Sequence, residues 1–64
     1  MMERLQELAM AAKAAADSPC TRHQGEIAQG LLKMAMDATN VVEADIMMEQ
    51  AEEYLIKAAQ LGGD

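Results

Sequence analysis

Apolar side chains recur every three or four residues along most of the chain, which is the spacing of one face of an α-helix. No stretch alternates apolar and polar residues, and β-branched residues are few, so the pattern does not support strands. We therefore expect an all-α protein whose first helix covers residues from about 2 to 16. The apolar positions sharing one face of that helix are Met1, Leu5, Leu8, Ala9, Ala12, Ala15 and Ala16.

The only proline, Pro19, ends the first helix, because proline disfavours a helical conformation in the residue before it. Pro19 also suits the first position of a following helix, with Ser18 as its N-cap. A second possible start follows at Thr21, which has capping-box spacing to Gln24. The sequence thus predicts a connection over residues 17–25 of unsettled register and a second helix from about 21 to 38.

The second helix carries an apolar stripe and an interior glycine. The stripe consists of Ile27, Leu31, Met34, Ala35 and Ala38, with Ala28 at its edge. Glycine inside an exposed helix is less favourable than alanine by about 1 kcal/mol. Gly30 is interpreted either as the site where another helix approaches closely or as a tolerated glycine.

Asn40 and Glu43 repeat the capping-box spacing, which favours a break and a third helix over about 41–61. The alternative is one continuous helix over 21–61, about 60 Å long at 1.5 Å per residue. Gly62 and Gly63 provide the C-terminal stop.

The third helix has the clearest periodicity. Its heptad seam consists of Ala44, Met47, Ala51, Tyr54, Ala58 and Leu61, widened by Val41, Met48, Leu55 and Ala59. Glu53 and Lys57 are spaced for a favourable ion pair along the helix. The residues predicted to form the core or an oligomer contact are Leu5, Leu8, Ile27, Leu31, Met34, Met47, Met48, Ala51, Tyr54, Leu55 and Ala58.

The composition indicates that these helices have little to bury. Among 64 residues there are 13 alanines and 7 methionines, but one tyrosine and no phenylalanine or tryptophan. A chain of this size buries only about 60% of the surface exposed when it is unfolded. We therefore expect a small antiparallel bundle of two or three helices, forming one domain over residues 1–64 and completed by homodimerisation.

The charge limits the partners. The net charge is −6, and residues 41–64 hold six of the acidic side chains against Lys57 alone, a local net of −5. Nucleic acids and anionic membranes attract basic surfaces, so neither is an expected partner. The sequence contains no run of about 20 apolar residues, which is the length needed to span a membrane. Glu3 and Glu7 argue against a signal peptide, so we expect a cytoplasmic protein.

The outer side of the third helix is the candidate binding surface. Branched aliphatic side chains are interleaved there with acids, a combination that suits a groove with a basic rim. The residues are Val42, Asp45, Ile46, Glu49, Glu53 and Ile56. Met10 and Met36 are expected to project outward from the first two helices.

This surface predicts a non-enzymatic protein-binding module, such as an adaptor, chaperone or inhibitor. The alternative is a purely structural oligomer subunit, in which the same residues contact another copy of the chain. Both interpretations require the outer side of the third helix to be covered by another protein chain.

Cys20 and His23 suggest a third alternative, a metal or thiol-redox protein. Zinc sites need three or four protein ligands, so two chains would have to meet at these residues. A Cys/His nucleophile would further need an oxyanion hole and a cavity, for which a short alanine-rich chain has little room. We therefore expect no metal, no cofactor and no catalytic residue.

Overall fold

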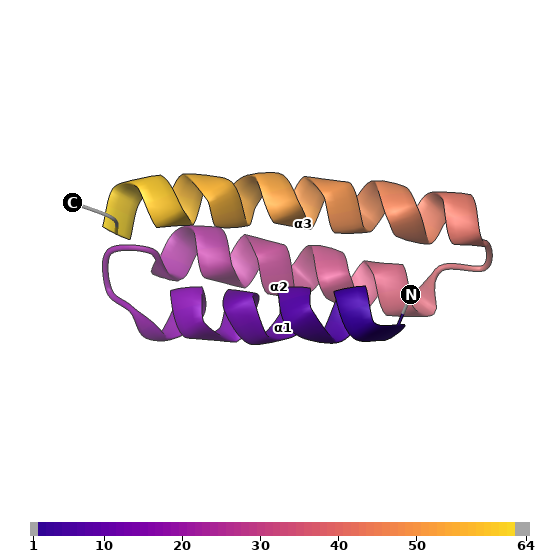
Figure 1. Cartoon of the computed structure of the whole chain (residues 1–64), viewed down its shortest axis with the longest axis horizontal. Helices are drawn as coiled ribbons and strands as arrows, with labels where there is room; N and C mark the ends of the chain where they lie inside the picture. The colour runs from indigo at the N-terminus through magenta and orange to yellow at the C-terminus, as the bar shows by residue number, and fades with distance from the viewer. Residues whose placement is uncertain (1, 63–64) are drawn as a thin grey trace.

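The computed structural model describes residues 2–62, which form three helices and no strand. Their bounds are Met2–Asp17 for α1, Arg22–Asp37 for α2 and Val41–Gly62 for α3. Successive helices run antiparallel, and α2 lies between α1 and α3 (Figure 1). The all-α class and the packing of three helices are confirmed, whereas dimerisation stays a prediction. Met1 and Gly63, assigned above to the first apolar face and the C-terminal stop, lie outside the described residues.

The first connection is a turn from Ser18 to Thr21, closed by a bond from the Thr21 amide to the Ser18 carbonyl at 3.3 Å. Pro19 therefore lies within the turn, and the prediction that Ser18 caps a helix starting at Pro19 is wrong. Thr21 occupies the N-cap position of α2, but its side chain makes no capping bond. Its hydroxyl instead donates to the Ala15 carbonyl at 2.7 Å, satisfying an acceptor near the end of α1.

The second connection is set by a side-chain cap. The Asn40 Oδ1 accepts a hydrogen bond from the Glu43 backbone N–H at 2.8 Å, as the capping-box spacing predicts. Ala38 ends α2 in an extended conformation, with φ −65° and ψ 144°. The alternative of one continuous helix is therefore wrong.

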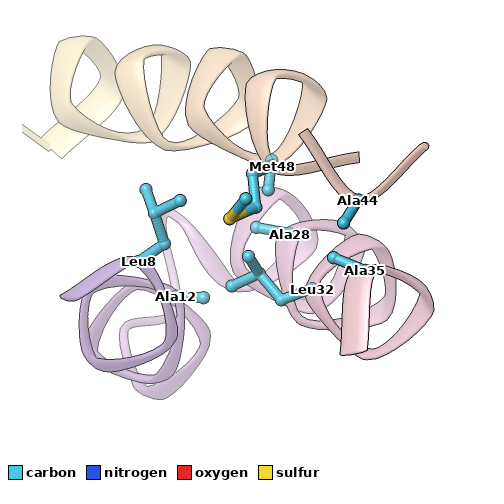
Figure 2. Packing of buried hydrophobic residues seen from close by; sticks show 8 residues of the cluster. Leu8, Ala12, Ala28, Leu32, Ala35, Ala44 and Met48 are labelled. Carbon is cyan, nitrogen blue, oxygen red and sulfur yellow. The ribbon is translucent and has the colours of Figure 1, made fainter. Parts of the chain in front are cut away.

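The core is built mostly from alanines contributed by all three helices. Figure 2 shows Leu8, Ala28, Leu32 and Met48 pointing into the space that the helices enclose. The buried cluster consists of Leu8, Ala12, Ala28, Leu32, Ala35, Ala44, Met48 and Ala51, and the partly buried side chains packed against it are Leu5, Leu31, Ala38, Met47, Tyr54 and Leu55. Because most members are small, the helices must approach closely to exclude water.

The buried face of α2 differs from the predicted stripe. Leu32 is buried, whereas Leu31 and Ile27 are only half-buried and Met34 is 56% exposed. The reason is that α2 packs against two neighbours at once, which moves the centre of its buried arc to Ala28. Met34 is therefore not part of the core of the single chain.

The glycine that permits close packing is Gly25, not Gly30. A Cβ at Gly25 would lie 2.6 Å from the Ala16 Cα and 2.7 Å from the Ala15 carbonyl carbon. A Cβ at Gly30 would meet nothing within 4 Å. Gly25 thus lets the first turn of α2 rest on the last turns of α1.

Helix α3 is longer than the helices it packs on. It has 22 residues against 16 in each of α1 and α2, about 33 Å against about 24 Å. Ala44, Ala51 and Ala58 of its seam are buried, Met47 and Tyr54 are half-buried, and the terminal seam residue Leu61 is exposed.

Candidate protein-binding surface

The outer side of α3 exposes three branched aliphatic side chains. Helix α3 turns Ala44, Met48 and Ala51 toward α1 and α2, so positions half a turn away face solvent. Val42 is 71% exposed, Ile46 45% and Ile56 54%. We name the α3 outer stripe as Val42, Ile46, Glu49, Glu53 and Ile56, all of which are exposed.

The structure places Asp45 at the edge of this surface rather than within it. The Arg4 Nη1 of α1 donates to the Asp45 Oδ1 at 2.8 Å, and the Arg4 Nη2 lies 3.7 Å from the Glu52 Oε2. Asp45 therefore joins α3 to α1, so its carboxylate is already partnered. Nothing in the local sequence pattern marks Arg4 or Glu52, because these contacts join residues of α1 and α3 that are far apart in the chain.

The acids of the stripe carry unpaired charge. Within residues 2–62 every ion pair involves Arg4, so the predicted Glu53–Lys57 pair is not formed. The Lys57 Nζ lies instead 5.1 Å from the centroid of the Tyr54 ring, in reach of a cation–π contact. Glu49 and Glu53 are thus free to meet a basic partner.

The structure also contains a groove between α1 and α2 that sequence analysis missed. Its volume is about 370 Å³, and it shares Leu5 and Met36 with a second hollow of about 350 Å³ beside the α2–α3 connection. We name the first hollow the α1–α2 groove. It is lined mainly by Leu5, Ala9, Leu32 and Met36, with Lys13 and Lys33 on its rim.

The groove left only a weak signal in the sequence. The outward projection of Met36 was expected, but the predicted stripe of the second helix omitted Leu32. Lys13 and Lys33 lie on different helices, 20 positions apart, and only the pairing of α1 with α2 brings them to the same hollow.

Cys20 and His23 are both exposed, Cys20 in the first connection and His23 in the first turn of α2. Within the part of the chain that the structure describes, no three His, Cys, Asp or Glu residues are grouped to hold a metal ion. Residues 2–62 also include no helix with the length and apolar character needed to cross a bilayer.

Comparisons of the chain with protein-family models, with curated proteins and with solved structures give no significant match. The molecule's own surface is therefore the guide to its function. That surface offers two features suited to binding: the α3 outer stripe, which is apolar and acidic, and the α1–α2 groove, which is apolar and basic at its rim.

Proposed function

We propose that this chain is a small, acidic, non-enzymatic protein-binding module of the cytoplasm, acting as an adaptor, chaperone or inhibitor through the α3 outer stripe. The observation that carries the proposal is the exposure of Val42, Ile46 and Ile56 on the side of α3 that faces away from the core. Removing such side chains from water contributes about 25 cal/mol for each Å² of apolar surface buried.

The shape and stiffness of these side chains also suit a binding role. Valine and isoleucine have one strongly preferred χ1 rotamer in a helix, so little side-chain freedom is lost when a partner covers them. The regular helix around them holds their spacing fixed. A partner therefore meets a largely preorganised surface, which favours affinity.

The charge of the stripe indicates the chemistry of the partner. Glu49 and Glu53 lie between the aliphatic side chains of Ile46 and Ile56. A complementary surface would therefore have an apolar floor and basic groups at its rim. Opposite charge would raise the rate of encounter and disfavour acidic competitors.

A purely structural role as an oligomer subunit is the second candidate, supported by the alanine-rich core. A core of small side chains provides limited stabilisation to a single chain. In that case the α3 outer stripe would be covered permanently by another copy, and variants of it would lose helical structure as well as association.

Capture from native lysate, compared across variants, tests the proposal. The stripe variants are Val42→Asp and Ile46→Asp, and the control is Ala14→Asp, at an exposed α1 position away from the stripe. We expect at least one protein to be retained by wild type and Ala14→Asp but lost by both stripe variants, all with unchanged circular dichroism. Retention of the same proteins by all four chains would contradict the proposal, and loss of helicity in both stripe variants would favour the structural role.

A further inference from the structure

The α1–α2 groove has the properties that a partner of the α3 outer stripe needs. Its apolar floor is formed by Leu5 and Leu32, with the exposed side chains of Ala9 and Met36 beside them. Its rim carries two of the five basic side chains of the protein, Lys13 and Lys33. The stripe offers aliphatic side chains for such a floor and two unpaired glutamates for such a rim.

The two surfaces lie on opposite sides of the molecule. The residues lining the groove belong to α1 and α2. Leu8, Ala28 and Met48 fill the other side of that helix pair, where α3 covers it (Figure 2). The α3 outer stripe faces away from this core. A groove and a stripe on opposite sides cannot both engage the same second molecule.

We propose that the α3 outer stripe of one copy docks in the α1–α2 groove of a second copy, head to tail. The inference rests on the proposed function, because it names a partner for the same stripe. The contact joins two different surfaces, so it is heterologous and produces an open stack or a ring rather than a two-fold dimer.

The groove accommodates the middle of the stripe. Its lining extends over residues 5–13 of α1 and 29–36 of α2, about 12 Å and about 11 Å at 1.5 Å per residue. The stripe extends about 21 Å from Val42 to Ile56, whereas its central part from Ile46 to Glu53 extends about 11 Å. The groove therefore seats Ile46 and the two glutamates, and Val42 and Ile56 lie beyond its ends.

The contact is expected to be weak and reversible. A standard interface buries about 800 Å² on each partner, nearly a fifth of the 4465 Å² surface of this chain. One helix face in a shallow groove covers less than that, which places the contact among transient ones. A second copy and a foreign partner then compete for the stripe, and each open stack keeps one stripe and one groove free at its ends.

Complementation between two variants tests the head-to-tail contact. Ile46→Asp disables the stripe and leaves the groove intact, whereas the double variant Lys13→Glu/Lys33→Glu reverses the rim and leaves the stripe intact. By sedimentation velocity across micromolar to millimolar concentrations, each variant alone is expected to associate at least about tenfold more weakly than wild type. An equimolar mixture is expected to form a dimer that goes no further, since each chain supplies one working surface.

Controls separate this contact from loss of fold and from general charge effects. Ala14→Asp and Arg22→Glu change exposed residues outside both surfaces and are expected to associate like wild type. Circular dichroism should be the same for all variants, because every changed residue is exposed. Wild-type association should weaken as salt screens the lysines and glutamates.

Four outcomes would overturn the inference. Wild type could be monomeric at every concentration, or the mixture of variants could fail to form a dimer. Undiminished association of the double lysine variant would show that stripes pair symmetrically. If wild type is monomeric, and the double lysine variant fails to retain a lysate protein that wild type retains, then the groove binds a foreign partner instead. The proposed function survives each of these results if Val42→Asp and Ile46→Asp still release their common partner, and fails on its own if they do not.

Discussion

Gly25 of α2 rests directly on the backbone of Ala16 in α1, at a place where any side chain would collide with it. A Cβ there would lie 2.6 Å from the Ala16 Cα, closer than real Cβ contacts come. The last turns of α1 and the first turn of α2 are therefore packed backbone to backbone. In a protein whose core is largely alanine, such close approach replaces the bulk that large side chains supply elsewhere.

Replacing Gly25 with alanine should therefore destabilise the protein by about 1–3 kcal/mol, the usual effect of overpacking, despite the higher helix propensity of alanine. Gly30→Ala is the matched control, because nothing lies within 4 Å of its Cβ position. That variant should be more stable than wild type by up to about 1 kcal/mol. Urea denaturation followed by circular dichroism measures both, and equal effects would contradict the assigned packing.

Thr21→Val should lower the free energy of unfolding by about 1–2 kcal/mol. Valine keeps the shape of the buried side chain but removes the hydroxyl that donates to the Ala15 carbonyl. Thr21→Ser keeps the hydroxyl and should regain most of the loss. Thermal denaturation of the two variants compares them, with the exposed Thr39→Val as control. A serine variant as unstable as the valine variant would show that the bond contributes little.

Met48→Ala should leave the protein largely unfolded at 25 °C. The Met48 side chain is 2% exposed and lies in the core between the three helices (Figure 2). Replacing a buried methionine with alanine destabilises by about 2–5 kcal/mol, and a core of this size supplies only about 3–5 kcal/mol. Met10→Ala, at an exposed methionine, should keep wild-type helicity by circular dichroism. A folded Met48→Ala variant would argue against the packing described.

Arg4→Gln should destabilise by less than about 1 kcal/mol at low salt, and by less still as salt is added. The Arg4 guanidinium pairs with Asp45 and Glu52 at the surface, where solvent weakens the attraction. Denaturation of wild type and variant at several sodium chloride concentrations measures the difference. An effect that persists in high salt would show that the arginine stem contributes by packing instead.

Local sequence patterns predicted the elements of the fold well. Asn40 and Glu43 located the second break because a side-chain cap depends only on residues three positions apart. Thr21 and Gln24 have equivalent spacing, yet the Thr21 hydroxyl bonds to Ala15 of the preceding helix. The same local pattern therefore led to two results, and the difference came from whether a second helix offered a competing acceptor.

The candidate binding site was also predictable only in part. The α3 outer stripe could be predicted because one helix determines which of its residues lie opposite its buried face. The ion pair between Asp45 and Arg4 could not be predicted, since the two residues lie 41 positions apart in the chain. The α1–α2 groove could not either, because its floor and its two lysines come from separate helices.

The sequence by itself determined that the chain is helical, where its helices begin and end to within a few residues, and that the outer side of α3 is apolar and acidic. Tertiary structure alone decided that Leu32 rather than Met34 is buried, that Gly25 is the point of close approach, and that Lys13 and Lys33 border one groove. The physical reason is the distance along the chain over which each interaction acts. Helix periodicity and capping act within a few residues, whereas the rotation of each helix is chosen by the neighbours against which it packs.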